Sequence, residues 1–173
     1  MTFNRYNRSE NENQKFRDAG TDVSGNQLSA VGIEGVAATS NVLPNKLSST
    51  VTFVAGTTGA VAAHDIFTVT GTVAVTLFAV CTTNVAGSGT IEVGTADSTA
   101  ALIAQTTGTD IDAKEIWHDA SPDASVEAVS VLTTKIVTDD IIYTIASDTL
   151  TSGVVTFYLS WYPISSGATV VVA

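Results

Sequence analysis

The pattern of hydrophobic and polar residues changes near residue 47 of this chain. From residue 48 onward, short runs rich in Val, Ile and Thr are separated by Gly, Asn, Asp and Ser, which is typical of short antiparallel strands. The runs predict strands over 49–55, 65–70, 72–82, 90–95, 101–106, 115–118, 125–137, 140–146, 154–162 and 169–172. Strands at this spacing indicate a β-sandwich or a barrel.

The strand predicted over 154–162 shows most clearly which side chains face the core. Its odd-numbered residues are large and apolar, and its even-numbered residues are Thr, Tyr and Ser. Because successive side chains of a strand point to opposite faces, the buried set is predicted to be Val155, Phe157, Leu159 and Trp161.

The run over 72–82 is apolar on both faces. Its odd-numbered residues from Val73 to Cys81 share one face, and Phe78 and Val80 make the other face apolar as well. We therefore expect this strand to be central in its sheet or covered on both sides.

Two Ala-rich stretches, 98–105 and 125–132, are compatible with a helix as well as with a strand. Their neighbouring Thr and Val residues disfavour the helix, because β-branched side chains lose rotamer freedom against the preceding helical turn. We expect strands at both places.

Residues 1–47 follow neither the helical nor the strand period, and are rich in Asn, Arg, Glu, Gln, Ser and Gly. Pro44 marks the approach to the strand-rich region. We predict an extended N-terminal arm over 1–47, followed by a β-sandwich domain over 48–173. Fixing a backbone costs about 1 to 2 kcal/mol per residue, so we expect the arm to order only against a partner.

Charge separates the same two regions. The chain has 173 residues, of which 45% are hydrophobic and 14% are charged, and this composition excludes wholesale disorder. Residues 1–46 are neutral, whereas 47–173 hold two lysines and twelve carboxylates and therefore the whole net charge of -10. Coulomb repulsion makes a nucleic-acid partner improbable. No apolar stretch is long enough for a secretory signal or a membrane span, so we expect cytoplasmic synthesis and no membrane partner.

The chain offers little catalytic chemistry. His64 and His118 are its two histidines, and no known catalytic or phosphate-binding motif surrounds either of them. Cys81 lies in an apolar run, which is typical of a small buried hydrophobic residue rather than a nucleophile or a zinc ligand. We therefore predict a protein that is not an enzyme and binds no cofactor.

One segment, 109–123, gathers carboxylates around Trp117 and His118. Its candidate ligands for a hard cation are Asp110, Asp112 and Glu115, followed by Asp119 and Asp123. An EF-hand loop needs Asp-x-Asp-x-Asp-Gly and a distal Glu, and only two positions match. We therefore favour solvated, turn-forming carboxylates and predict no metal site.

Exposed aromatic side chains suggest two kinds of surface. Tyr158 and Tyr162 are predicted to lie on the outward face of the 154–162 strand. Aromatic rings at such positions stack on sugars or fill a subunit interface, and the sequence leaves both open.

The amino-acid sequences of several segments resemble those of a known protein family. The stretch DIFTVTGTVAVTLFAVCTT (65–83), followed by GTIEVGTA (89–96), ALIAQTTGTDIDA (101–113) and EIWHDASPDAS (115–125), is similar to small structural proteins of tailed bacteriophages. The similarity covers roughly 50–165 and leaves the arm outside. It implies a virion component that resembles head decoration or cement proteins, commonly trimeric jelly rolls. The expected fold class is all-β: a jelly-roll-like antiparallel β-sandwich preceded by the extended arm.

The resemblance also implies partners. A decoration protein binds the major capsid protein on the outer surface of the head, and as a trimer it binds two further copies of itself. The acidic domain favours the outer surface, away from packaged DNA. The interface candidates are Phe3, Tyr6, Phe16, Ile33, Val36, Tyr158 and Tyr162. The alternative is a tail or fibre component, or a carbohydrate-binding β-sandwich that recognises host surface glycans.

Overall fold

The structure is a computed structural model, and it describes residues 44–173. Five of the interface candidates lie outside the described residues: Phe3, Tyr6, Phe16, Ile33 and Val36. The predicted arm also lies outside them up to residue 43. The region from Pro44 onward forms one compact unit.

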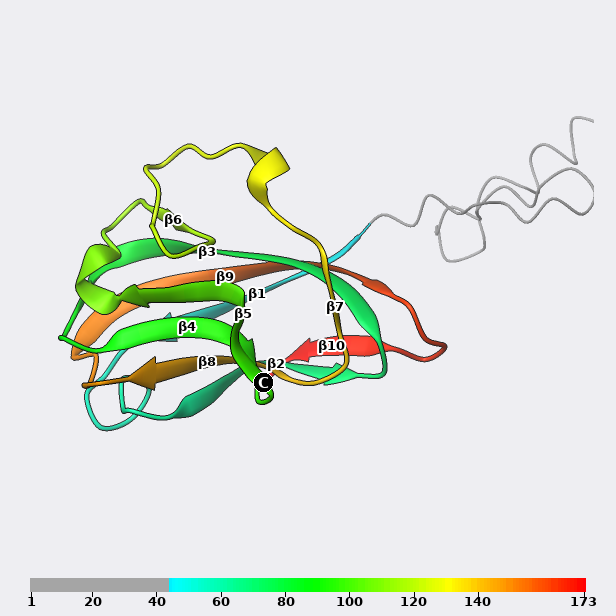
Figure 1. The fold of residues 1–173 in the computed structure, drawn as a ribbon, viewed down its shortest axis with the longest axis horizontal. Helices are drawn as coiled ribbons and strands as arrows, with labels where there is room; N and C mark the ends of the chain where they lie inside the picture. Colours follow the sequence, from blue (N-terminus) through cyan, green and yellow to red (C-terminus); the bar gives the residue numbers. More distant parts are fainter. Residues whose placement is uncertain (1–43) are drawn as a thin grey trace, which may run out of the picture. The chain divides into compact units, whose positions relative to one another are not determined.

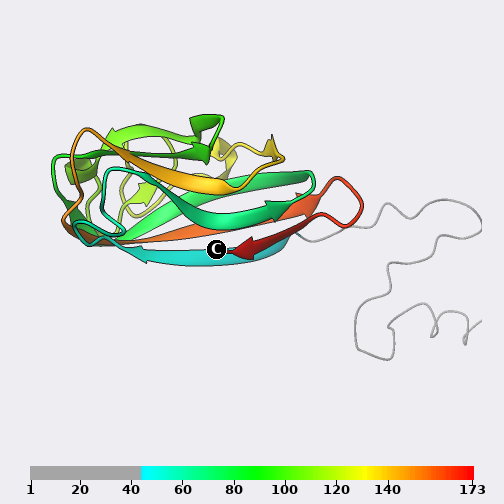
Figure 2. The same cartoon turned by 90° about the horizontal axis from the view of Figure 1, so that it is seen from below.

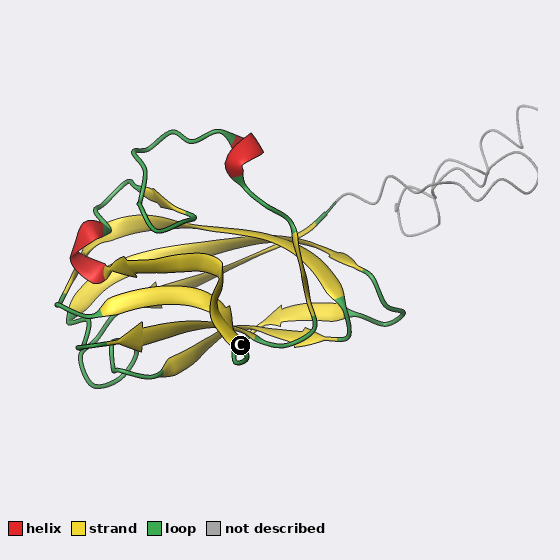
Figure 3. Ribbon diagram, viewed as in Figure 1, coloured by secondary structure: helices red, strands yellow, loops and turns green. Residues whose placement is uncertain are grey.

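This region is almost entirely β-structure (Figure 3). Its strands are β1 (Asn45–Thr52), β2 (Ala63–Thr70), β3 (Val73–Ala86), β4 (Thr90–Thr95), β5 (Ser98–Thr107), β6 (Ile116–Trp117), β7 (Lys135–Val137), β8 (Ile141–Ala146), β9 (Ser152–Pro163) and β10 (Thr169–Val172). Two short 3-10 helices are η1 (Gly108–Asp110) and η2 (Val129–Val131). Within residues 44–173, no helix is long and apolar enough to cross a membrane.

The strands form two five-stranded sheets that pack face to face (Figures 1 and 2). Sheet A has the order β1-β9-β3-β6, with β7 also paired to β3, and sheet B has the order β10-β2-β8-β4-β5. The antiparallel pairs are nested along the chain: β4 with β5, β3 with β6 and β7, β2 with β8, and β1 with β9. Two sheets with this nested pairing make a jelly roll, which confirms the expected all-β sandwich.

The core lies between the sheets, and the alternation read from the sequence is confirmed. The odd-numbered residues of β9 from Val155 to Trp161 are buried, as are those of β3 from Val73 to Cys81. β3 lies between β9 on one side and β6 and β7 on the other, so it is central in sheet A, as expected.

The strand predicted over 125–137 is wrong for most of its length. Only β7 at its end is a strand, and the residues before it belong to a loop over 118–134 that contains η2 and arches out from the sandwich (Figure 1). Val126 and Val129 in this loop are 85% and 82% exposed. β-branched residues favour a strand only where a neighbouring strand supplies hydrogen bonds and packing, and residues 125–134 pair with no strand. The helical alternative over 98–105 is also wrong, because these residues lie within β5.

Candidate functional site

The loop 118–134 begins at a rigid point of the core. Trp117 is fully buried and its ring lies against Phe157, with ring centroids 6.2 Å apart. The next turn is closed by two backbone hydrogen bonds between Ile116 and Asp123, of 3.0 and 2.8 Å. This short antiparallel bridge brings the side chain of Asp123 back beside His118, which directly follows the strand β6.

Three carboxylates surround the imidazole of His118. Its Nε2 lies 2.9 Å from Oδ2 of Asp123 and 3.8 Å from Oε2 of Glu127, and its Nδ1 lies 3.9 Å from Oδ2 of Asp119. The His118 side chain is only 9% exposed. In the described region, His118, Asp119 and Asp123 are the group whose ligand atoms lie close enough together to hold one metal ion. We refer to these residues with Glu127 as the His118 cluster.

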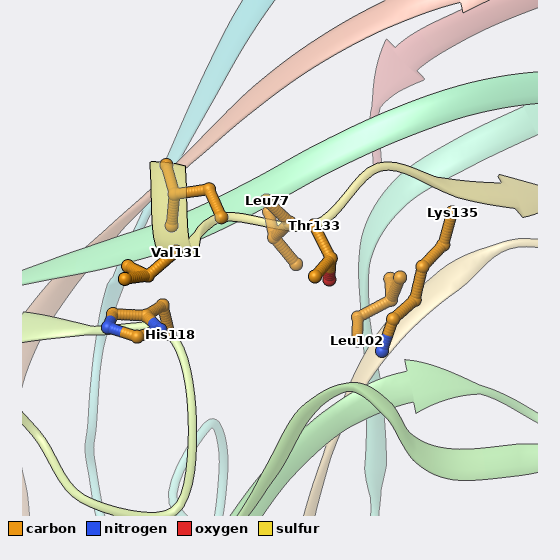
Figure 4. A pocket seen from close by; sticks show the side chains of 7 residues that line it. Leu77, Leu102, His118, Val131, Thr133 and Lys135 are labelled. Atoms are coloured by element: carbon orange, nitrogen blue, oxygen red, sulfur yellow. The ribbon is translucent and has the colours of Figure 1, made fainter. Parts of the chain in front are cut away.

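The His118 cluster lines one end of an open groove of about 410 Å³ between the loop and the edge strand β5. The apolar part of its lining consists of Ala100, Leu102, Ala104 and Val131. Lys135 lines the groove as well, and its Nζ donates a hydrogen bond to the carbonyl of Ala101. Figure 4 shows a smaller adjoining cavity of about 20 Å³, with His118 at one end and Lys135 at the other.

The cation ligands that the sequence singled out lie elsewhere. Asp110 is exposed in η1. Asp112 accepts a 2.6 Å hydrogen bond from the amide of Asn84, and Oε2 of Glu115 accepts a 2.8 Å bond from the backbone N–H of Asp112. Asp112 and Glu115 therefore stabilise a local turn, as the turn-forming alternative expects. Sequence reasoning also noted His118, Asp119 and Asp123, but it ranked them as candidates behind Asp110, Asp112 and Glu115. It did not identify Glu127.

Neither histidine is arranged as the base of a nucleophile in the described part of the chain. His64 hydrogen-bonds the carbonyl of Ala60 at 3.0 Å and stacks on the ring of Tyr143, and the hydrogen-bond partner of His118 is a carboxylate. Cys81 is buried, and burial raises the pKa of its thiol. A raised thiol pKa disfavours the reactive thiolate.

A second feature is the outer face of sheet A, the side of β1, β9, β3, β6 and β7 that points away from the core. Cross-strand neighbours on this face form three rows that share apolar or aromatic side chains. The rows are Ile136, Ala74 and Tyr162; Phe78 and Tyr158; and Ile116, Val80 and Thr156. Ile136 is 70% exposed, which is a large fraction for an isoleucine in a strand.

The predicted outward position of Tyr158 and Tyr162 is confirmed by their exposure. The ring of Tyr158 lies nearly parallel to that of Phe78, with centroids 5.3 Å apart and an interplanar angle of 18°. One face of each ring is therefore covered by the other. The pair and the row of Ile136, Ala74 and Tyr162 lie on the same face, and Thr76, Ser160 and Lys46 lie between them.

Charge is almost absent from the strands of sheet A. They contain no Asp or Glu, and their charged residues are Lys46 and Lys135. Asp65 and Glu92 lie in sheet B, and the other carboxylates of residues 44–173 lie in the segments between strands. The acidic character of the domain therefore belongs to sheet B and the loops.

The chain matches no family model. Neither the curated proteins nor the solved structures include a significant match to it. These residues define an all-β jelly-roll sandwich that has one outer sheet face without carboxylates and a histidine and carboxylate cluster beside a groove.

Proposed function

We propose that the chain is a non-enzymatic structural protein of a virion, a decoration or cement protein that binds the outer surface of a phage head. The observation that carries the proposal is the outer face of sheet A, which presents Phe78, Tyr158, Tyr162 and Ile136 with Lys46 as its one charged residue. Exposed aromatic and aliphatic side chains that gather on one face of a domain are typical of a protein interface. The jelly roll is itself common among viral capsid domains.

The partners of this face are, in the proposal, two further copies of the chain and the major capsid protein. Obligate interfaces are depleted in charge at their centre and enriched in aromatic residues, as this face is. The carboxylates on sheet B and in the loops then point toward solvent and away from negatively charged DNA. The predicted arm ends earlier than residue 47, because β1 begins at Asn45. In the proposal, the residues before β1 extend the contact to neighbouring capsomers through their own apolar side chains.

Recognition of host glycans, as in a fibre component or a carbohydrate-binding module, is the second candidate. Exposed Tyr158 and Tyr162 favour it. Sugar stacking uses open ring faces, and one face of Tyr158 is already covered by Phe78. An interface between proteins uses ring edges and aliphatic surface as well, so these side chains favour a protein interface over a glycan site.

A matched pair of charge substitutions tests the proposal. Ile136→Asp places a carboxylate on the outer face of sheet A, and Val171→Asp places one on the outward side of β10 in sheet B, where the native valine is 54% exposed. An unpaired charge in an interface costs several kcal/mol, so Ile136→Asp should weaken trimer formation and binding to undecorated heads by about a hundredfold or more. Val171→Asp should leave both within about threefold.

Light scattering and a head-binding assay measure the two effects. A monomer that does not bind heads but binds a glycan would replace the proposal by its alternative. Equal losses in both variants would remove the outer face of sheet A as the contact.

The arm has a separate test. Deletion of 1–40 should leave the domain folded, because the core cluster lies within 53–170. It should abolish attachment to heads, and unchanged attachment would refute the role given to the arm.

A further inference from the structure

The His118 cluster lies apart from the outer face of sheet A, and the decoration function makes no use of it. Three carboxylates within 3.9 Å of one imidazole are an unusual concentration of negative charge. The one cationic side chain that lines the groove, Lys135, is engaged by the carbonyl of Ala101. The cluster thus has the charge and the donor atoms of a site for a cation.

We propose that Nε2 of His118, together with the carboxylates of Asp123 and Glu127, binds one divalent transition-metal cation of the zinc class. The two donor separations from Nε2, 2.9 and 3.8 Å, bracket the ~3.3 Å between neighbouring ligands of a tetrahedral Zn²⁺ with bonds of about 2.0 to 2.1 Å. A small adjustment of the Glu127 side chain brings its Oε2 to the separation from Nε2 that two ligands of such a cation have.

The identity of the donors selects the class of cation. Imidazole nitrogen with carboxylate oxygens suits Zn²⁺ and its neighbours among the transition metals, whereas Ca²⁺ and Mg²⁺ prefer sites made of oxygen alone. The hydrogen on Nε2 is now donated to Asp123. The cation takes its place, and the neutral ring then carries its one hydrogen on Nδ1.

Asp119 completes the arrangement as a positioning residue. With Nε2 on the cation, the other ring nitrogen carries the hydrogen, and Nδ1 faces Oδ2 of Asp119 at 3.9 Å. A carboxylate behind the distal nitrogen is the usual partner of a metal-binding histidine, because it fixes the tautomer and the ring orientation. Asp119 is itself held by a 2.7 Å hydrogen bond from the backbone N–H of Ser121.

Two further observations distinguish the cluster from ordinary surface carboxylates. The His118 side chain is more than nine-tenths buried, and the bridge between Ile116 and Asp123 fixes both ligands to the core before any ion arrives. The carboxylates also open onto the groove, which gives a cation a path from solvent to the cluster.

The cation has a structural consequence for the loop. Glu127 lies between Val126 and η2, in the exposed part of the loop, while His118 is anchored beside the core. One ion bound by both residues fastens the tip of the loop, with its exposed Val126 and Val129, onto the sandwich.

The test uses the full chain after treatment with a chelator, titrated with ZnCl₂ by calorimetry and followed by thermal unfolding. We expect one Zn²⁺ per chain and a Tm that rises with Zn²⁺ concentration, because an ion that binds only the folded state stabilises it. His118→Gln, Asp123→Asn and Glu127→Gln should each weaken binding at least tenfold. Asp119→Asn should weaken it by about 10- to 100-fold while stoichiometry is kept.

Asp110→Asn is the matched control, since it removes the same charge from an exposed position outside the cluster. It should leave the affinity unchanged, as should His64→Gln, which alters the other histidine of the chain. Circular dichroism confirms that each variant is folded, and the visible spectrum of the Co²⁺-loaded protein reports imidazole coordination directly.

Three results would overturn the proposal. They are wild-type binding no tighter than that of His118→Gln, equal weakening by Asp110→Asn, or Ca²⁺ binding as tight as Zn²⁺ binding.

Discussion

Sheet A and sheet B contribute to one core but present different surfaces to solvent. The outward side of sheet B carries Asp65, Glu92 and Gln105, and the last two are joined by a 3.1 Å hydrogen bond. The outward side of sheet A carries the aromatic pair Phe78 and Tyr158 and holds no carboxylate. A face that only meets water has no need of such a pair.

The comparison teaches that burial and surface chemistry are set by different parts of the sequence pattern. Inward residues are apolar in both sheets because the core must exclude water. Outward residues are free to vary, so their character reports what the face meets. The difference between the two outward faces is therefore the stronger functional signal.

The largest expected effect is a difference in unfolding free energy between substitutions on the buried and the exposed side of β9. Phe157→Ala removes a fully buried ring that packs against Tyr143 and Trp117, and should lower the free energy of unfolding by about 3 to 5 kcal/mol. Tyr158→Ala, one residue along, removes an exposed ring stacked on Phe78 and should cost about 1 kcal/mol. Urea unfolding at concentrations where the protein is monomeric measures both.

Equal decreases in the free energy of unfolding for Phe157→Ala and Tyr158→Ala would contradict this difference between the two sides of β9. They would mean that the outer face of sheet A is itself a core layer within one chain, rather than a surface kept for a partner.

The second prediction concerns a polar group on the buried side of sheet B. The hydroxyl of Tyr143 donates a 2.8 Å hydrogen bond to the carbonyl of Thr58, and burial raises the pKa of Tyr143 from 10.0 to about 12. Tyr143→Phe removes the hydrogen bond and should lower the free energy of unfolding by about 1 kcal/mol at neutral pH.

The raised pKa gives the same residue a pH signature. The folded chain keeps the phenol proton over a range in which the unfolded chain has lost it, so stability falls as the pH rises from about 10 to 12. Tyr143→Phe lacks this contribution, and its unfolding free energy should fall less steeply across that range. Parallel slopes for the two proteins in urea titrations at several pH values would contradict the assignment.

Local pattern predicted much of the fold. The bounds of β4 and β10 agree with the residues expected from their β-branched runs, and the two-residue period identified the buried face of β9. The pairing of β1 with β9 was beyond such reasoning, because partners such as Thr50 and Thr156 lie 106 residues apart and no local signal links them. The resemblance, rather than the pattern, supplied the expectation of a jelly roll.

The candidate site shows the same limit at shorter range. Spacing drew attention to Asp110, Asp112 and Glu115, which lie together in the sequence. The structure instead gathers His118, Asp123 and Glu127, because a backbone bridge and an arching loop bring them together. The turn-forming residues Ser121 and Pro122 were the one local sign that Asp123 folds back.

The smallest expected effect on the free energy of unfolding is that of replacing an outward threonine by valine, and it should have opposite signs in sheets A and B. Thr144 in β8 has a buried hydroxyl that lacks a hydrogen-bond partner among the described residues, and its cross-strand neighbours are Ala63 and Glu92. A buried hydroxyl without a partner is destabilising, and Val has the same shape and favours strands. Thr144→Val should therefore raise the free energy of unfolding by about 0.5 to 1 kcal/mol.

The same change in sheet A should be unfavourable. The hydroxyl of Thr156 shares a 2.9 Å hydrogen bond with that of Thr50 across β1 and β9, so Thr156→Val should lower stability by about 0.5 kcal/mol. Urea unfolding of both variants beside the native chain gives the two signs. A loss of stability in Thr144→Val would show that its hydroxyl has a partner in solution, and the polar character of sheet B would then extend to that position.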